Sequence, residues 1–244
     1  MYSGKQELDD NSKWLRTYNG DIAGLLYSST QYLRRPPSAS NKADEKMRIL
    51  DFGAGIGTIT RLIRERNVCH EYFCVELDPH LKSCLPDWSI SSTHLLDEWR
   101  GTMDLVVTSN VIEHINDDVE IMRQLHGVLS DYGVISVYVP AIPFLWTRMD
   151  DNVGHYRRYT ITSLRKILES SGFSVKEIRY VDSVGGIATL FFRLKELMSR
   201  SNSYKPPSEG LLRFYDRYIW PASRIMDLIM NQYFGKNILA IASK

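Results

Sequence analysis

Short apolar runs and helical stripes of apolar residues alternate along most of the chain. The runs predict strands, because each is short and several stop at a glycine, an acid or a proline. The stripes place apolar residues three and four positions apart, which predicts helices. We predict strands at 49–52, 72–75, 88–93, 103–109, 134–139, 173–181 and 237–243, and helices at 14–33, from 58, 79–84, 116–129, 160–172, 189–199 and 211–233. Strands that alternate with helices indicate an α/β fold with a mostly parallel sheet.

One segment combines a strand, a tight turn and the start of a helix. Arg48-Ile-Leu-Asp-Phe-Gly-Ala-Gly-Ile-Gly57 carries glycines at 53, 55 and 57, which permit unusual backbone angles or close approach to a ligand. The helix predicted from Thr58 points its N-terminal N–H groups toward this turn. The dinucleotide fingerprint would need its third glycine at Thr58, and no Gly-Lys-Ser/Thr of a P-loop follows. The alternative is a tight turn without a ligand.

An acid ends the next predicted strand. Glu76 follows Tyr72-Phe-Cys-Val75, about 20 residues beyond the glycines, where a βαβ unit carries its ribose-binding acid. A carboxylate there can accept two hydrogen bonds from a ribose diol. Asp78 competes for this role, and an ordinary solvated Glu is the alternative. Glu76 is favoured because it is the first acid after the apolar run.

Together these residues resemble the S-adenosylmethionine (SAM) motif of class I methyltransferases. Asp-x-Gly-x-Gly-x-Gly ends the first strand and Glu76 the second, and Asp104 opens the strand that runs into Asn110-Val-Ile-Glu-His114, as in members that act on small molecules. The resemblance covers about residues 47–181 and 237–243. It implies a Rossmann-like α/β fold with a seven-stranded mixed sheet, the last strand antiparallel, and helices on both faces. It also implies SAM as cofactor and S-adenosylhomocysteine as product.

The same resemblance implies which residues contact the cofactor. The motif's acid and turn would place the methionine part, Glu76 the ribose, and the segment after the third strand the adenine. Asn110 would face the methionine part. The residues so implied are Asp51, Gly53, Ala54, Gly55, Glu76, Leu77, Leu95, Asp97 and Asn110.

The segment 140–159 is the predicted acceptor-binding loop. It is rich in aromatic and charged residues, directly follows a core strand, and leaves the same sheet edge as the glycine turn. Its Gly-His-Tyr-Arg-Arg-Tyr sequence resembles a broad methyltransferase branch whose genes often accompany glycan and natural-product pathways. We predict acceptor contacts from Trp146, Tyr156, Arg157 and Tyr159. The alternatives are that the tyrosines only pack and that Arg157 or Arg158 pairs with Asp150 or Asp151.

Two histidines are candidates for the base that removes a proton from the acceptor. Histidine suits this role near neutral pH. His155 is the first candidate because it lies in the acceptor loop, and His114 is the second. A His155 that only holds the loop by hydrogen bonds is the alternative. One ubiquinone-pathway branch binds a divalent metal through an acidic pair and this His, but Asn110 replaces the first acid here, so we predict no metal.

Composition narrows the class of protein and of partner. The chain has 244 residues and a formal net charge of +1, so no overall field indicates nucleic acid binding. The three cysteines fit neither a zinc pattern nor a disulfide framework, which predicts a reducing cytoplasmic location. We predict no signal peptide and no membrane-spanning segment. The chain is expected to be a monomer or a homodimer.

The ends and one insertion depart from the resemblance. Residues 1–46 are predicted to form an N-terminal helical cap and linker, 47–182 with 236–244 the SAM-binding core, and 183–235 a helical insert before the last strand. The insert is basic and carries two apolar stripes. It could pack on the core, act as a lid or dimer contact, or touch a membrane surface through an amphipathic face.

The sequence therefore predicts a SAM-dependent methyltransferase (EC 2.1.1.-) that acts on an O or N atom of a small molecule. A natural-product, glycan or lipid-linked pathway is expected. The alternatives are a catalytically silent methyltransferase-like subunit and another nucleotide-binding Rossmann enzyme such as a reductase, although the shifted glycine and the lack of a Tyr-x-x-x-Lys pair argue against the reductase.

Overall fold

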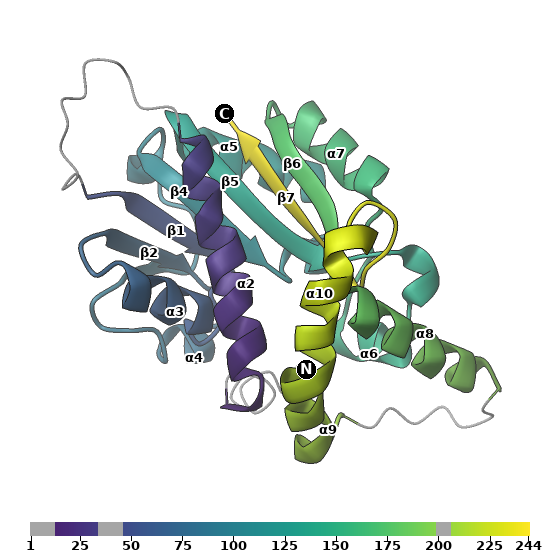
Figure 1. Ribbon diagram of the computed structural model, residues 1–244. Coiled ribbons are helices and arrows are strands. Elements are labelled where there is room, and N and C mark those ends of the chain that lie inside the picture. The colour runs from purple at the N-terminus through teal and green to yellow at the C-terminus, as the bar shows by residue number, and fades with distance from the viewer. Residues whose placement is uncertain (1–12, 34–45, 199–205) are drawn as a thin grey trace.

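The computed structural model describes residues 13–33, 46–198 and 206–244 (Figure 1). Its centre is a seven-stranded sheet in the order β3-β2-β1-β4-β5-β7-β6. The strands are β1 (Arg48–Phe52), β2 (Glu71–Val75), β3 (Ile90–Ser92), β4 (Met103–Ser109), β5 (Leu129–Pro140), β6 (Ser174–Val181) and β7 (Asn237–Ser243). Only β7 runs antiparallel to its neighbours, β5 and β6, among these strands. The predicted mixed sheet with an antiparallel last strand is confirmed.

Helices cover both faces of this sheet, as expected for alternating strands and helices. They are α2 (Arg16–Ser28), α3 (Thr58–Arg66), α4 (Pro79–Lys82), α5 (Asp118–Val128), α6 (Arg148–Val153), α7 (Ile161–Ser170), α8 (Ser183–Met198), α9 (Glu209–Phe214) and α10 (Trp220–Met230). A 3₁₀ turn, Ser29–Tyr32, extends α2, and a π-helical turn, Tyr215–Ile219, joins α9 to α10. No helix in the described ranges is long and apolar enough to cross a bilayer.

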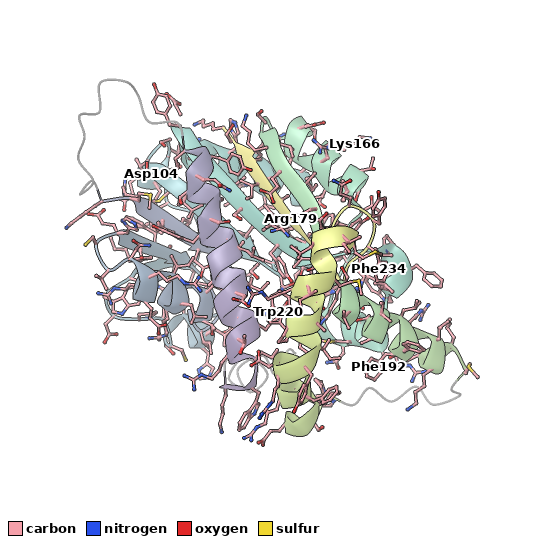
Figure 2. The ribbon with its side chains drawn as sticks, viewed as in Figure 1. Asp104, Lys166, Arg179, Phe192, Trp220 and Phe234 are labelled. Carbon is pink, nitrogen blue, oxygen red and sulfur yellow. The ribbon has the colours of Figure 1, made fainter. Side chains whose placement is uncertain are left out.

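Successive residues of a strand point to opposite faces of the sheet, so the sheet packs against a separate hydrophobic core on each face. Leu50 of β1 packs in a cluster with the apolar stripes of α5 and α7. Its neighbour Ile49 packs on the other face with α2, α3 and Trp220 of α10. Figures 1 and 2 show α2 and α10 lying across this second face, with Trp220 between them. The N-terminal helix and part of the insert thus share one face of the sheet.

The helix boundaries differ from the predictions in three places. The acceptor loop, in which no helix was predicted, contains a 3₁₀ turn, Pro143–Leu145, and α6. The helix predicted from 116 begins only at Asp118, after a 3₁₀ turn that contains Glu113 and His114. The first insert helix starts at Ser183 rather than 189. Its early glycines hid this start, since glycine weakens helix propensity.

Packing explains one of these glycines in α8. A Cβ on Gly186 would lie 2.7 Å from the ring of Phe234 and 3.0 Å from the backbone of Lys236. The residue is therefore required for close contact with the segment that leads into β7. Strands β1, β2, β4, β5 and β6 all end at the same edge of the sheet, and β7 begins there. We call this the carboxyl edge.

Candidate functional site

The glycine turn after β1 contacts the end of β2 and the loop after β4. Gly53 N and Ala54 N donate to the carbonyl of Val75 at 2.8 and 3.0 Å. Gly53 has a φ of +76°, and a Cβ there would lie 2.3 Å from Val111 in the loop after β4. Only glycine fits at this position. The loops after β1, β2 and β4 therefore form one packed unit at the carboxyl edge.

Glu76 lies directly against this turn. One carboxylate oxygen accepts a hydrogen bond from Gly55 N at 2.7 Å, and the other accepts from Asp78 N at 2.9 Å. Asp78 itself caps α4 by accepting from His80 N at 2.8 Å. Because each carboxylate oxygen has more than one lone-pair site, Glu76 can still accept a hydrogen bond from a ligand on the turn. The structure thus assigns the two competing acids different local partners.

Asp51 lies beneath the turn rather than on it. Its side chain is almost fully buried, and Thr60 Oγ1 on α3 donates to it at 2.5 Å. Burial raises the pKa of this carboxyl to about 6, against the opposing effect of the Thr60 hydrogen bond. Asp51 therefore joins β1 to the first turn of α3 and holds the glycine turn from below.

Asn110 begins the loop after β4 in a strained conformation. Its φ is +54°, which is uncommon for a residue other than glycine. Its backbone N donates to the carbonyl of Tyr138 on β5 at 2.8 Å, and its side chain is exposed. Such outliers are found at functional sites when the surrounding structure enforces them. Asn110 stands beside the glycine turn, between the cofactor side and the acceptor loop.

Glu113, His114 and His155 form a compact cluster at this edge. The rings of His114 and His155 meet edge to face with centroids 4.6 Å apart. His155 Nε2 lies 3.8 Å from Glu113 Oε1, and Tyr156 N donates to the carbonyl of Glu113 at 2.8 Å. One ligand atom from each cluster residue lies within 4.8 Å of the other two, so the group could hold a metal ion. The acceptor loop and the loop after β4 thus meet here.

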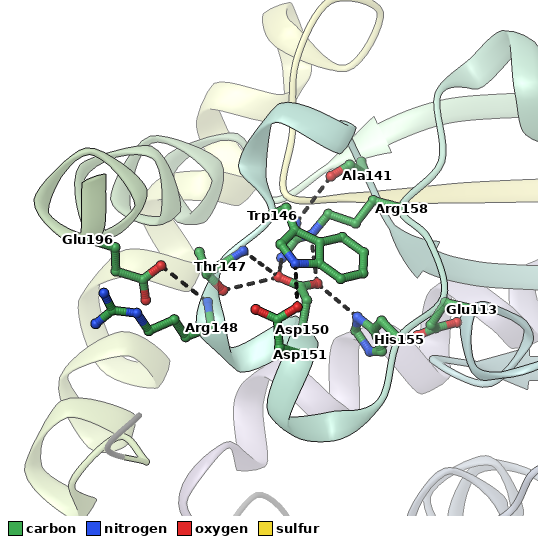
Figure 3. Close-up of polar contacts among 10 residues, drawn as sticks. All are labelled: Glu113, Ala141, Trp146, Thr147, Arg148, Asp150, Asp151, His155, Arg158 and Glu196. Atoms are coloured by element: carbon green, nitrogen blue, oxygen red, sulfur yellow. Dashed lines mark hydrogen bonds and ion pairs between the residues drawn. The ribbon is translucent and has the colours of Figure 1, made fainter. Parts of the chain in front are cut away.

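Asp150 is the buried hub behind His155 (Figure 3). It is 1% exposed and accepts from His155 Nδ1 at 2.8 Å, Arg158 Nε at 2.7 Å and Thr147 N at 2.8 Å. Burial alone would raise the pKa of Asp150, but these hydrogen bonds and the charge of Arg158 hold it well below its usual value. An ionised carboxylate only accepts, so Nδ1 carries a proton, and in the neutral form of the ring the lone pair is on Nε2.

Burial shifts the other members of the cluster toward their neutral forms. Glu113 is fully buried, and neither of its carboxyl oxygens has a hydrogen-bond partner among the described residues. Burial raises its pKa to about 8. Burial and the nearby His155 lower the pKa of His114 to about 4. At neutral pH the cluster therefore presents a mostly protonated carboxyl, a neutral His114 and a His155 oriented by an anion.

This geometry agrees with the comparisons with known proteins. A family described as a methyltransferase domain matches residues 27–178, more than half of the chain. The chain belongs to this methyltransferase family. Its fold and family make it a SAM-dependent methyltransferase, with SAM as cofactor. No curated protein matches the sequence.

Solved structures with the same fold are distant in sequence from this methyltransferase. A SAM-dependent methyltransferase from Archaeoglobus fulgidus is 17% identical, with a TM-score of 0.59 and coverage of 98% of this chain and 100% of the other. A putative sarcosine dimethylglycine methyltransferase from Galdieria sulphuraria is 14% identical, with a TM-score of 0.55 and coverage of 92% and 84%. Phosphoethanolamine N-methyltransferase 2 from Haemonchus contortus, solved with SAM, is 13% identical, with a TM-score of 0.53 and coverage of 92% and 57%.

The predicted adenine contacts Leu95 and Asp97 share a depression beside α5. Asp97 is exposed and pairs with Arg100 at 3.2 Å. With Leu95 it lines a depression of about 430 Å³ along α5, from Glu120 to Val128. The contact of these two residues with adenine stays a prediction. Leu77 is largely exposed beyond Glu76.

The segment beside Glu76 at the end of β3 is Ser92, the last residue of the strand, followed by Thr93 and His94. Glu76 N donates to the carbonyl of Ser92 at 3.0 Å, and Ser92 Oγ accepts from His94 N at 3.2 Å. Sequence reasoning missed them because β3 is short and poorly patterned. The signal that could have found them is the parallel pairing expected of successive strands in a βαβ sheet, which places the end of β3 at Ser92 opposite the end of β2 at Val75.

Two of the four predicted acceptor contacts are structural instead. Tyr159 is 1% exposed, and its hydroxyl donates to Asp118 at 3.0 Å. Arg157 pairs with the same carboxylate at 2.6 Å. The packing alternative therefore holds for Tyr159. Of the two arginines, Arg158 pairs with Asp150, as the pairing alternative predicted, whereas the partner of Arg157 is Asp118. Tyr159 and Arg157 tie the acceptor loop to the first turn of α5.

The other two predicted acceptor contacts remain available to a ligand. Tyr156 is 60% exposed, next to His155. Trp146 is half-buried, its Nε1 donates to Asp151 at 2.9 Å, and its ring lies 6.5 Å from that of His155. The two aromatic side chains come from opposite ends of α6. They lie on either side of the His155 imidazole along the chain.

An aromatic network from distant segments also borders the carboxyl edge, and sequence reasoning missed it. The hydroxyls of Tyr18 on α2 and Tyr138 on β5 lie 3.0 Å apart. Tyr215, after α9, donates its hydroxyl to buried Asp182, and Lys236 lies 5.0 Å above its ring. The partners are too far apart in sequence for any local pattern to link them.

Proposed function

We propose that this methyltransferase transfers the methyl group of SAM to an O or N atom of a small-molecule acceptor, with His155 as the base. In the reaction the carbon–sulfur bond of the sulfonium breaks and its electron pair stays on sulfur. The acceptor atom forms the new bond to the methyl carbon, and its proton passes to His155 Nε2. The observation that supports this is the buried Asp150, which fixes the His155 tautomer. His114 is the second candidate.

On the cofactor side, the proposed ligands follow from the packed turn. The backbone of Gly53, Ala54 and Gly55 would approach the methionine part, and Glu76 would accept hydrogen bonds from the ribose diol. Asn110 would lie between the bound cofactor and the acceptor loop. Alignment of nucleophile, methyl and sulfur in a site shielded from water supplies most of the rate.

A small-molecule acceptor is supported by the relatives and by charge. The Galdieria protein is described as a putative sarcosine dimethylglycine methyltransferase and the Haemonchus protein as a phosphoethanolamine N-methyltransferase. A net charge of +1 gives no field for a nucleic acid. Tyr156 and Trp146 would contact the acceptor. A natural-product, glycan or lipid-linked pathway fits an acceptor loop of this kind.

The mechanism that we propose uses no metal. Glu113, His114 and His155 could offer three ligand atoms, but burial keeps Glu113 mostly protonated at neutral pH, and a protonated carboxyl is a poor ligand. Turnover should therefore survive dialysis against EDTA. Activity that is lost in EDTA and restored by Zn²⁺ would make the cluster a metal site instead.

The direct test replaces the base. His155→Gln should lower the formation of S-adenosylhomocysteine with a panel of hydroxyl and amine acceptors by about 10²–10⁴-fold, the range for removal of a general base. SAM affinity, measured by calorimetry, should stay unchanged. His80→Gln, on the exposed side of α4, is the matched control. A fully active His155→Gln would reject the base, and a wild type that binds SAM but methylates no acceptor would favour the silent subunit.

A further inference from the structure

The outer face of α8 carries large apolar side chains that nothing in the described chain covers. Phe191, Leu194 and Met198 are spaced by three and four residues and so share one face of the helix. They are 70%, 43% and 87% exposed. The opposite side of α8 carries Gly185 and Gly186, which are buried against the core. The helix is thus amphipathic, with its apolar stripe facing outward.

Helix α10 repeats this arrangement. Ile225, Leu228 and Ile229 share a face by the same spacing and are 72–80% exposed, whereas Trp220 on the inner side is buried. The two helices pack against each other. In Figure 2, Phe192 extends from α8 at the lower right, away from the sheet. We call the exposed apolar side chains of α8 and α10 the insert surface.

A surface of this kind is expected to contact a partner or a membrane. Exposed apolar residues are common singly, but groups of large ones mark contact with a partner or a membrane. Neither helix is long and apolar enough to cross a bilayer. Amphipathic helices of this kind can instead lie in the headgroup region, with their apolar side in the acyl chains.

The acidic side chains of the insert point toward the rest of the protein or are paired, whereas basic side chains are exposed beside the insert surface. Residues 183–235 contain seven basic and four acidic residues. Three of the acids bind backbone N–H groups of the core: Glu196 that of Arg148 at 3.1 Å, Asp216 that of Tyr18 at 2.8 Å, and Asp227 that of Asp182 at 2.8 Å. The fourth, Glu209, pairs with Arg213 at 2.6 Å. The negative charge is therefore directed inward or neutralised.

Positive charge borders the insert surface instead. Lys195, Arg217 and Arg224 are exposed next to its apolar residues, and of these Arg224 pairs with Asp21 at its outer end. Basic residues beside an apolar face match an anionic lipid surface. A second copy of the chain is a poorer match, because a two-fold interface would bring this basic border close to itself.

We propose that the insert surface docks the enzyme on an anionic phospholipid bilayer, with α8 and α10 lying in the plane of the headgroups. The docking would orient the site as well. Glu196 on α8 holds the start of α6, and Phe144, beside α8 in the acceptor loop, is 63% exposed. The acceptor loop would then face the lipid. That an acceptor reaches the site from the bilayer rests additionally on the proposed function.

The test is flotation of the full chain with vesicles, without SAM or acceptor. Vesicles of phosphatidylcholine with phosphatidylglycerol should retain the wild type, and phosphatidylcholine alone or high salt should weaken this. The double variant Phe191→Glu/Ile229→Glu should bind at least tenfold more weakly, since each change removes an apolar side chain that would insert into the bilayer and adds a charge that anionic lipid repels. Its melting temperature and SAM affinity should not change, because both positions are exposed.

The matched control is Val68→Glu, which makes the same kind of change at a 68% exposed apolar residue outside the insert. It should bind vesicles like the wild type. The proposal is overturned if the wild type does not float, if the double variant floats equally well, or if neutral and anionic vesicles bind equally. A dimer in sedimentation that the double variant loses, without vesicle binding, would assign the surface to a second copy. None of these outcomes depends on turnover.

Discussion

The carboxyl edge of the sheet has two halves that are built in different ways. In the cofactor half, the loops after β1, β2 and β4 are joined mainly by backbone atoms, as where Gly53 N and Ala54 N donate to Val75. In the acceptor half, the loop after β5 is held by charged side chains around Asp150. Apart from positions such as Gly53 where only glycine fits, backbone hydrogen bonds do not depend on which side chain is present, whereas a buried charge depends on each partner. The halves should therefore fail in different ways when altered.

The two halves each contain a buried aspartate, and the pKa values of these two aspartates are shifted in opposite directions. Burial raises the pKa of Asp51 in the cofactor half, where a single hydroxyl donates to it. In the acceptor half, hydrogen bonds from His155 and Arg158 overcome burial and lower the pKa of Asp150. The folded state thus favours the neutral form of one acid and the charged form of the other. Their replacement by asparagine should have opposite consequences.

The largest effect is expected for Asp150→Asn. Arg158, itself almost fully buried, would lose its anionic partner, and breaking such a pair costs about 3–5 kcal/mol. His155 would lose the acceptor that fixes its tautomer, so turnover should fall as well. Denaturant unfolding measures the first effect, and S-adenosylhomocysteine formation at a temperature where the variant is folded measures the second.

The neighbouring Asp151→Asn is the control for this variant. The side chain of Asp151 is exposed, and Trp146 Nε1 donates to it at 2.9 Å. Its replacement should change stability by less than about 1 kcal/mol. Equal losses in the two variants would show that the ion pair with Arg158 contributes little, and the contrast between the halves would fail.

The same difference explains what the sequence could predict. The cofactor half is local: a strand, three glycines and an acid after the next strand lie within Arg48 to Glu76. Their spacing predicted the turn and the place of Glu76 directly after β2, where the structure shows it accepting from Gly55 N. Strand β7 was predicted to the residue despite the insert before it. Hydrophobic alternation and glycine geometry act over a few residues, so they can be read from sequence.

The acceptor half depends on contacts that no local pattern encodes. Tyr159 was predicted to face an acceptor, but it is buried on Asp118, 41 residues away in sequence. The network of Tyr18, Tyr138 and Tyr215 joins three segments that meet only in the folded chain. Sequence indicated this loop as functional but could not assign its side chains.

The next largest effect is expected at Asp51 in the cofactor half, where the free energy of unfolding should depend on pH. The folded state holds the pKa of Asp51 near 6 rather than the ordinary 3.8, so folding disfavours the ionised carboxylate. The resulting cost is absent below about pH 4, grows as the pH rises through this window, and is complete above about pH 6. At about 1.4 kcal/mol per pKa unit, it amounts to roughly 3 kcal/mol.

Asp51→Asn removes this titration and keeps an oxygen that can accept from Thr60. The free energy of unfolding of the variant, relative to wild type, should therefore rise between pH 4 and pH 7. Asp150 acts in the opposite sense, because its lowered pKa adds stability above its ordinary value that is lost in acid. A pH-independent difference between wild type and Asp51→Asn would contradict the account of the cofactor half.

The smallest effect is expected where backbone dominates, at Glu76. Glu76→Ala should weaken SAM binding by about 1–3 kcal/mol, the scale of lost charge-assisted hydrogen bonds, and calorimetry measures it. Stability should change little, because Gly55 N and Asp78 N lie at a partly exposed edge where water can replace the carboxylate. Asp78→Ala separates the two acids: it removes the α4 cap but not the proposed ribose ligand. If Asp78→Ala weakened SAM binding while Glu76→Ala did not, the ribose ligand would be Asp78, on the other side of Leu77 in the sequence, and not Glu76.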